Sequence, residues 1–589
     1  MEQISKAPSF TAASGQTRLA TAAGIVVAVI VIAGLLALGF DPIFCQGIAY
    51  AAGLSVFLTI DRRWAYPSSG DNGRRTSFFM LAAAVAYAIS LALLSVFVRK
   101  PVLNVYVAQL VAGAAFLFLV VVFYRVAFAS FVDRPLQLKQ SFSWLFSPAT
   151  GRGIFAAAIV VFLIIDAGAL WNVSRSIEQR AADPTYDRVP QWIKSAECFK
   201  KTGIILVVCL DGRTLSPIED ASTADDRGHG LLLSGLHKWL DVPTSRAALV
   251  WINVAINLVG FALLALQIYR FGYRIAGIGS FLGALPWVSN ALVNSDVIGA
   301  SYGLFALSLL LPLQMLRQFS IDRQSTSEWI WFAVSALALV AVMLMREPFG
   351  SIAILISVVL VLACTIWRFR TFRVGHAALI VLSFASFWLA AHGTELLVKY
   401  RETAQGVATG RGILTHGLSH NLYIGLGAEP NALGIEWSDT YAANLVKSID
   451  PTVLYGSPKY FEVLGRAYVD LVMRHPVEVA KIYASKAAKV LTPKIVVWLT
   501  FAIAFMMSML ALYRLEQGKF VRQPPLSAIC MVAVAATLLH AAQAIMTVPS
   551  PGYFTQANIG LVLIAALAVD LWFEAIWGRE RCRPDQEGP

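Results

Sequence analysis

The sequence contains few charged residues: Asp, Glu, Lys and Arg make up 14% of its 589 residues, against roughly 25% in soluble domains. Hydrophobic residues make up 58%, and the mean hydropathy is +0.67. This composition excludes a soluble globular protein, and the alternating polar and apolar pattern of a membrane β-barrel is missing too. Because only helices and closed barrels satisfy their backbone hydrogen bonds in lipid, the sequence predicts an all-α polytopic membrane protein.

Two other patterns are missing. The six cysteines and eight histidines show no spacing typical of a zinc site, and no internal repeat of the kind found in many transporters is recognisable. A zinc domain and an inverted-repeat transporter are therefore not supported. The net charge of +12 invites a nucleic-acid interpretation. The basic residues, however, lie at the ends of apolar runs, as the positive-inside rule predicts, so we expect contact with membrane lipid and no nucleic-acid partner.

Apolar runs near twenty residues long recur along the chain, and each can cross a hydrocarbon core of about 30 Å as a helix. We count about fourteen such runs, near residues 19–40, 44–60, 77–98, 103–127, 153–172, 248–269, 274–291, 297–316, 328–345, 350–367, 375–395, 492–513, 526–547 and 556–577. Only a short segment around Val293-Asn294-Ser295-Asp296 separates the runs 274–291 and 297–316, which leaves a bent or re-entrant element open there. We expect residues 1–150 to be an N-terminal addition of four helices and a linker, and residues 151–589 to be the main module.

The basic residues predict the orientation. Most Lys and Arg clusters between runs fall on one face if the runs alternate, and the positive-inside rule makes that face cytoplasmic. In a bacterial inner membrane both termini are then cytoplasmic, and the two long polar segments, 173–247 and 396–491, are periplasmic. Two large outer loops predict a shared site beneath them. Cys198 and Cys209 lie in the first loop and can form a disulfide if that loop faces an oxidising compartment.

The first loop contains the run Asp225-Asp226-Arg-Gly-His229, followed by apolar residues at helical spacing from Leu231 to Leu240. The apolar stripe predicts a helix that lies on the membrane surface. In one interpretation an aspartate before that helix is only a cap. In the other it is a general base, because a carboxylate beside His and Arg combines a proton acceptor with an orienting group and counter-charge for an anionic substrate.

The second loop concentrates polar side chains among glycines and aromatics: His416, His420, Asn421, Glu436 and Asp439. The two histidines are four residues apart and would share one face of a helix. Three interpretations stay open for this segment. It is a turn platform held by hydrogen bonds, a set of contacts to sugar hydroxyls, or a site where His420 and Asp439 hold a divalent metal.

Charged residues at the ends of membrane spans suggest a function by default. Arg346 and Glu347 follow an apolar run, and Arg346 would hold a phosphate through two hydrogen bonds; the alternative is a structural contact at a helix break. Asp296 would position a ligand or cap the helix that follows it. In the second loop, Lys481, Lys486 and Lys489 approach the next span and would pair a lipid phosphate or only meet headgroups. Lys459 is a further residue that we expect to bind substrate.

This layout resembles the GT-C superfamily of integral membrane glycosyltransferases, over roughly residues 153–580. The resemblance rests on Asp225-Asp226-Arg-Gly-His229 before an interfacial helix, on Asn294-Ser-Asp296 at a helix edge, and on the second loop from His416 to Asp439. Members of that superfamily carry a catalytic acidic residue in the first large outer loop and use polyprenyl-phosphate-linked sugars or related lipid donors. Several of them use a divalent metal.

The resemblance implies an inverting glycosyltransferase that moves a sugar from a polyprenyl-phosphate donor to a glycan, lipid or protein acceptor of the cell envelope. Asp225 or Asp226 would deprotonate the acceptor hydroxyl. The residues expected to bind substrate are His229, Asp296, Arg346, Glu347, His416, His420, Asn421, Glu436, Asp439 and Lys459. Two alternatives stay open, a flippase or transporter of lipid-linked glycans and an envelope polymer ligase.

Overall fold

The computed structural model of the chain describes residues 188–210, 214–218, 226–291, 294–321, 324–368, 374–408, 417–491, 526–549 and 554–577, with scattered residues between 23 and 90. The chain divides into two compact units, Met1–Leu145 with Leu491–Lys519 and Phe146–Val490 with Phe520–Pro589. Nearly all described residues belong to the second unit, whose architecture follows. The four predicted N-terminal helices and the predicted spans 153–172 and 492–513 lie almost wholly outside the described residues.

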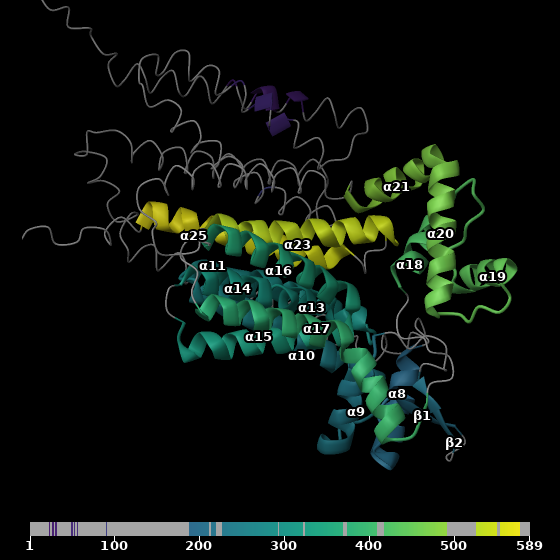
Figure 1. Cartoon of the computed structure of the whole chain (residues 1–589). Coiled ribbons are helices and arrows are strands. Elements are labelled where there is room, and N and C mark those ends of the chain that lie inside the picture. The colour runs from purple at the N-terminus through teal and green to yellow at the C-terminus, as the bar shows by residue number, and fades with distance from the viewer. Residues whose placement is uncertain are drawn as a thin grey trace, which may run out of the picture. The chain divides into compact units, whose positions relative to one another are not determined.

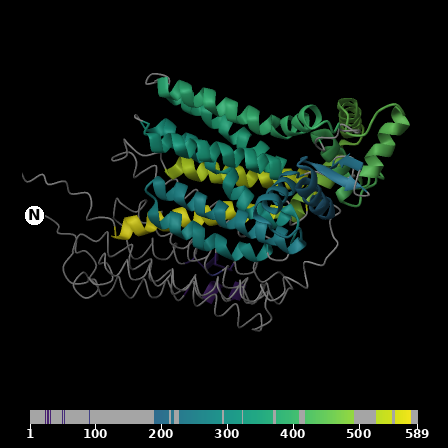
Figure 2. The same cartoon turned by 90° about the horizontal axis from the view of Figure 1, so that it is seen from below.

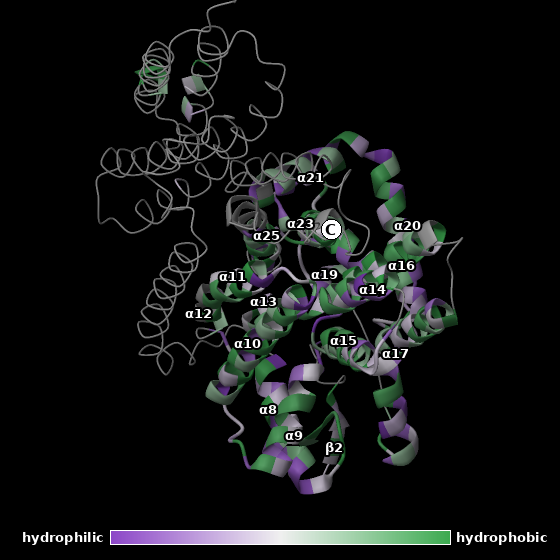
Figure 3. Cartoon of the chain, turned by 90° about the vertical axis from the view of Figure 1, so that its left-hand side faces the viewer, coloured by the Kyte–Doolittle hydropathy of each residue, from purple (hydrophilic) through white to green (hydrophobic). Residues whose placement is uncertain are grey.

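The second unit contains a bundle of apolar helices (Figure 1). Among the described residues, six segments are long and apolar enough to cross a membrane: Arg246–Arg270 (α10), Val297–Ser320 (η5, α13 and α14), Thr326–Met345 (α15), Glu347–Ile366 (in α16), Val374–Ala404 (α17) and Ala528–Met546 (in α23). Each coincides with a predicted span, and these helices are coloured mostly hydrophobic in Figure 3. The chain is therefore a largely helical, membrane-embedded protein, while the total of about fourteen spans stays a prediction.

The predicted span 274–291 is a broken element. It consists of α11 (Arg274–Ala284), the 3-10 turn η4 (Leu285–Trp287) and α12 (Val288–Ala291), and η5 (Val297–Ala300) begins the next helical segment. The bent element that the sequence left open is confirmed here. After η5 the chain continues into α13 (Ser301–Ser308) and α14 (Leu310–Ser320), and the last apolar helix is α25 (Asn558–Trp577).

Helices α10 and α13 cross at very close range. A Cβ built on Gly303 would lie 2.4 Å from Cα of Asn257, and one built on Gly260 would lie 2.4 Å from the carbonyl oxygen of Gly303. Small residues let helix backbones approach in this way within a membrane. Asn257 then bonds to the opposite backbone, donating to the carbonyl of Gly299 at 2.8 Å and accepting from the N–H of Gly303 at 2.6 Å.

The first long polar segment forms a small lobe, residues 188–240, built from α8 (Arg188–Thr202), a hairpin of β1 (Val207–Leu210) and β2 (Thr214–Pro217), and α9 (Gly228–Leu240). The antiparallel hairpin corrects the all-α prediction. The dipeptide Asp211-Gly212 between the strands is a favoured hairpin turn sequence. Helix α9 confirms the predicted amphipathic helix, with its N-terminal residues buried and Trp239 and Leu240 exposed at its end.

The predicted disulfide is confirmed: Cys198 on α8 is bonded to Cys209 on β1, with Cα atoms 5.4 Å apart. Replacing both cysteines by serine should destabilise the first lobe by about 3 kcal/mol, because the short closed loop no longer restricts the unfolded state. Hydrogen exchange of the amides in α8 and β1 measures this loss. Reductant should accelerate exchange in the native protein and leave the double variant unchanged; equal protection of both proteins would contradict the prediction.

The second long polar segment forms another lobe, residues 417–490, with α18 (Leu418–Gly425), η7 (Leu426–Ala428), α19 (Asp439–Ile449), α20 (Pro458–Arg474) and most of α21 (Pro476–Leu491). Its core includes Ile424, Val446, Tyr460 and Leu464. Helix α20 begins with Pro458 after Ser457, whose hydroxyl accepts from the N–H of Tyr460 at 3.2 Å. Helix α21 likewise begins with a proline, Pro476.

Both lobes lie at the end of the bundle where α10 begins and α15 ends (Figures 1 and 2), which we call the site end. Arg401, near the end of α17, donates to the carbonyl of Leu206 in the first lobe at 2.8 Å. Lys486 on α21 donates to the carbonyl of Thr547, just after α23, at 2.7 Å. The helix ends therefore hold the lobes in place over the bundle.

Candidate functional site

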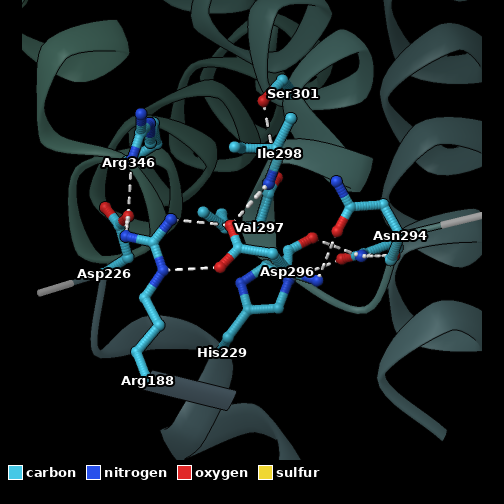
Figure 4. Close-up of polar contacts among 10 residues, drawn as sticks. Arg188, Asp226, His229, Asn294, Asp296, Val297, Ile298, Ser301 and Arg346 are labelled. Atoms are coloured by element: carbon cyan, nitrogen blue, oxygen red, sulfur yellow. Dashed lines mark hydrogen bonds and ion pairs between the residues drawn. The ribbon is translucent and has the colours of Figure 1, made fainter. Parts of the chain in front are cut away.

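Arg188, the first residue of α8, links two aspartates that are distant in sequence. Its Nε and Nη2 atoms donate to the two carboxylate oxygens of Asp296 at 2.6 and 2.7 Å, and its Nη1 donates to Oδ2 of Asp226 at 2.7 Å (Figure 4). The Arg188 side chain is 10% exposed and the Asp296 side chain is fully buried. Two parallel hydrogen bonds orient a guanidinium against a carboxylate, so Arg188 fixes the first lobe against the segment before η5.

Arg346 approaches the same oxygen of Asp226 from the bundle. Its Nη1 donates to Oδ2 of Asp226 at 2.6 Å, and the residue is 6% exposed. Arg346 is the single residue between α15 and α16. Its N–H donates to the carbonyl of Val342 at 2.7 Å, and its carbonyl accepts from the N–H of Phe349 at 3.1 Å. The helix break therefore carries its own backbone bonds, and the side chain is directed to the first lobe.

The position of Asp226 depends on a left-handed backbone and on a close helix contact. Its φ of 57° lies in the region that costs a non-glycine residue roughly 1–2 kcal/mol. Two residues later, Gly228 begins α9 against the end of α15. A Cβ on Gly228 would lie 2.7 Å from Cγ of Met345 and 2.9 Å from the carbonyl carbon of Leu344. Glycine thus permits the approach that brings Asp226 to Arg346.

Asp296 is held by a second set of bonds. Its Oδ1 accepts from the N–H of Ile298 at 3.1 Å, which makes it the N-cap of η5, and its own N–H donates to Oδ1 of Asn294 at 2.9 Å. Asn253 on α10 donates to the carbonyl oxygens of Asn294 and Asp296 at 2.9 and 2.7 Å. The amide of Asn253 therefore fixes the segment that carries Asp296 to the first turns of α10.

His229 is the second residue of α9 and is fully buried against the same asparagine. Its Nε2 is 2.6 Å from Oδ1 of Asn253, and its ring stacks on Trp192 with centroids 5.3 Å apart. Burial lowers the pKa of the imidazole, and the charge of Arg188 acts in the same direction; the bond to Asn253 and the charge of Asp296 oppose them. We therefore assign His229 as neutral near pH 7.

The charges of this cluster balance, since Arg188 and Arg346 carry two positive charges and Asp226 and Asp296 carry two negative ones. Buried ions need such compensation, and removing one partner of a buried pair costs roughly 3–5 kcal/mol. A phosphate offers acceptor oxygens like those of a carboxylate. An anionic phosphate ligand can therefore compete with Asp226 for the guanidinium groups.

The structure brings together four residues singled out from the sequence: Asp226, His229, Asp296 and Arg346. The N-cap of α9 is Arg227, without a side-chain bond, and the carboxylate of Asp226 pairs with Arg188 and Arg346. The capping interpretation of Asp296 is confirmed, together with its ion pair. Asp225 lies outside the described residues.

His420 and Asp439 form a separate cluster within the second lobe. Nδ1 of His420 is 2.9 Å from the Tyr460 hydroxyl, and Nε2 is 3.0 Å from Oδ1 of Asp439. Burial, with the charge of Asp439 as a smaller cause, raises the pKa of Tyr460. Both imidazole nitrogens are engaged, and the described residues contain no group of three or more His, Cys, Asp or Glu suited to a metal ion. These bonds are what the interpretation of a hydrogen-bonded platform predicts, while the metal and sugar-contact interpretations stay predictions.

The other candidates of the second loop are dispersed. Asn421 donates to the carbonyl of Gly417 at 3.3 Å, one turn back in its own helix. Glu436 is exposed, and Lys459 is 54% exposed and pairs with Glu462 at 3.3 Å. His416 lies outside the described residues. Helix α18 begins at Leu418, so the expectation that His416 and His420 would share one face if helical stays a prediction.

Glu347 is the first residue of α16 and is exposed, in contrast to the buried Arg346 beside it. The guanidinium of Arg346 pairs with Asp226, and the alternative of a structural contact within the pair Arg346 and Glu347 stays a prediction. The helix break was recognisable from Pro348, but the partner of Arg346 was not.

Sequence reasoning missed Arg188, Trp192, Asn253 and Asn257. The two asparagines are four residues apart in an otherwise apolar span, and polar residues at that spacing in a membrane helix could have been recognised as a bonding stripe. Arg188 had no such pattern. Its partners lie 38 and 108 residues away, so only the fold reveals the ion pairs.

Comparison with known proteins adds no assignment: no family model matches the chain, and no curated protein and no solved structure shows significant similarity to it.

Proposed function

We propose that the chain is a membrane glycosyltransferase that moves a sugar from a polyprenyl-phosphate-linked donor to a cell-envelope acceptor. The donor class comes from the GT-C resemblance. The observation that carries the proposal is the pair of buried guanidiniums, Arg188 and Arg346, which meet on one oxygen of Asp226 at 2.7 and 2.6 Å. The pair lies at the site end of a bundle of membrane-length helices, where a lipid phosphate would enter.

The phosphate of the donor would replace Asp226 as the hydrogen-bond acceptor of Arg346 and, in part, of Arg188. The donor is a phosphodiester with one negative charge, and the departing polyprenyl phosphate gains a second as the bond to the sugar breaks. Positively charged groups aimed at developing charge stabilise a transition state strongly when water is excluded. Asp226 would hold both guanidiniums in place until the donor arrives, and would compensate their charge when no donor is bound.

We place the site on the periplasmic face of a bacterial inner membrane. The disulfide between Cys198 and Cys209 in the first lobe supports an oxidising compartment. The amphipathic α9, with exposed Trp239 and Leu240, supports a lobe that rests on the membrane surface. Cytoplasmic termini follow from the distribution of basic residues.

Two other functions are compatible with a lipid phosphate site, a flippase for lipid-linked glycans and an envelope polymer ligase. A flippase needs polar groups along a path through the membrane, whereas the cluster of Arg188, Asp226, Asp296 and Arg346 is gathered at one end of the bundle. A ligase would also cleave a lipid-phosphate donor, but its donor would carry a polymer. The size of the sugar released from the lipid separates the ligase from the transferase.

The test is donor cleavage by the full chain in lipid nanodiscs. A panel of polyprenyl-phosphate monosaccharides, each with a radiolabelled sugar, is incubated with the protein and with membranes as a source of acceptor. We expect label to leave the lipid phase for one donor, with release of polyprenyl phosphate. Movement of intact donor across proteoliposomes without cleavage would instead establish the flippase, and cleavage of polymer donors alone would establish the ligase.

Arg346→Lys should reduce donor cleavage about 10- to 100-fold, because a lysine keeps the charge but loses the planar donor fork, at roughly 1.5–3 kcal/mol per charged hydrogen bond. We expect most of the loss as a higher KM for the donor. Steady-state kinetics at several donor concentrations measures it. Arg474→Lys is the matched control, because this arginine on α20 is 71% exposed, and it should leave the kinetics unchanged; equal effects of both variants would contradict the role of Arg346.

A further inference from the structure

The environment of His229 fixes its protonation pattern. Asn253 donates through Nδ2 to the carbonyl oxygens of Asn294 and Asp296, so its Oδ1 faces the imidazole as an acceptor. Nε2 of His229 must therefore carry the hydrogen of that 2.6 Å bond. The other nitrogen, Nδ1, keeps its lone pair when the ring is neutral. It is buried and has no hydrogen-bond partner among the residues that the structure describes.

Trp192 carries a second buried polar atom without a partner. Its indole stacks on the imidazole, and its buried Nε1 likewise has no partner within the described part of the chain. Gly230 admits the pyrrole edge of the indole, because a Cβ on Gly230 would lie only 3.1 Å from Cδ1, the ring atom next to Nε1. Two buried polar atoms of opposite kind, a donor and an acceptor, thus lie on two stacked rings. Buried polar atoms in folded proteins normally have a hydrogen-bond partner.

A hydroxyl group fits this pair. Its oxygen can accept from Nε1 of Trp192 while its hydrogen is donated to Nδ1 of His229. A phosphate or carboxylate oxygen can only accept, and an amide nitrogen can only donate, so neither completes both bonds through one atom. A donor on Trp192 and an acceptor on His229 therefore favour an alcohol hydroxyl, or a water molecule in its place.

The same cluster makes Asp226 a poor proton acceptor, because two guanidiniums bonded to its Oδ2 favour its charged form. His229 is neutral and has Asp296 close by to stabilise an imidazolium. The other charges around the ring come from Arg188 on α8, from Asp226 and Arg227 before α9, and from Arg346 after α15. An anionic donor that draws the two guanidiniums to its phosphate would make the imidazole more basic.

We propose that His229, held in one tautomer by Asn253, is the proton acceptor for an acceptor hydroxyl that Trp192 positions. This inference rests on the proposed function and deepens it, since it makes the product an O-glycoside of an alcohol. The acceptor oxygen bonds to C1 of the sugar as the C1–O bond to phosphate breaks, and that electron pair leaves with polyprenyl phosphate. The hydroxyl proton goes to Nδ1 of His229.

The test compares His229→Gln and Asp225→Asn with the native protein. A glutamine amide can keep the bond to Asn253 through its nitrogen but offers no acceptor at the Nδ1 position. We expect kcat to fall about 10²- to 10⁴-fold, the range for loss of a general base, and the acid limb of the pH profile of kcat to disappear. Binding of polyprenyl phosphate, used as the probe, should change less than about twofold, because the guanidinium pair is intact.

Trp192→Phe provides a second variant, which keeps the stacked ring and removes only the N–H. It should lower kcat/KM for the acceptor about tenfold, the loss of roughly 1.4 kcal/mol of hydrogen bonding, and its effect should not add to that of His229→Gln. A native kcat in His229→Gln, or an acid limb that persists there and disappears in Asp225→Asn, overturns the inference. Absence of donor cleavage by the native protein would instead count against the proposed function.

Discussion

Asp226→Asn should lower sugar transfer about 10²- to 10³-fold, the range for loss of one preorganised electrostatic group, and should destabilise the protein at the same time. An asparagine at this position accepts through one oxygen and carries no charge, so Arg188 and Arg346 would share only the charge of Asp296. Breaking a buried ion pair in this way costs about 3–5 kcal/mol. Donor cleavage and thermal unfolding in nanodiscs measure the two effects.

The double variant Asp226→Asn with Arg346→Gln distinguishes two effects: the loss of stability from unbalanced charge, and the loss of sugar transfer from a missing phosphate-binding group. It leaves one arginine, Arg188, facing one aspartate, Asp296, through the bonds at 2.6 and 2.7 Å. We expect much of the lost stability to return and sugar transfer to stay low, because the phosphate has lost a guanidinium. Native-like transfer in Asp226→Asn would contradict the role of this carboxylate. A double variant less stable than the single one would contradict the charge argument.

The parts of the fold that were predictable depend on local patterns. Hydropathy alone located the membrane helices, since each needs about twenty apolar residues in a row. The amphipathic stripe after His229 located α9. The pair Cys198 and Cys209 was recognisable because both lie in one short stretch of a loop. Each of these features is determined within a window of neighbouring residues.

The ion pairs of the site could not be predicted from such local patterns. Asp226 was singled out, but its two arginine partners lie 38 residues before it and 120 residues after it. Nothing in the sequence distinguishes Arg188 from the other 46 of the 47 Lys and Arg residues. The same holds for Asn253, whose contacts with residues near 294 depend on how closely α10 approaches α13.

Gly303→Ala should disrupt both the close approach of α10 to α13 and the candidate site. The added Cβ would lie 2.4 Å from Cα of Asn257 and 2.5 Å from the carbonyl oxygen of Ile256, and both are backbone atoms that cannot rotate away. We expect a loss of about 3 kcal/mol or more, the upper range for overpacking. Separation of α10 from α13 would also break the bonds of Asn257 to Gly299 and Gly303.

Gly279→Ala on α11 is the matched control, because its Cβ would meet only the Cβ of Ala566 at 3.5 Å, an ordinary contact. An alanine there should leave stability unchanged or raise it by up to about 1 kcal/mol through helix propensity. Thermal unfolding and donor cleavage are measured for both variants. In Gly303→Ala, stability and donor cleavage should fall together, since displacement of α10 carries Asn253 away from His229 and Asp296. If Gly303→Ala lost stability but retained sugar transfer, the crossing of α10 and α13 would not be what positions the site.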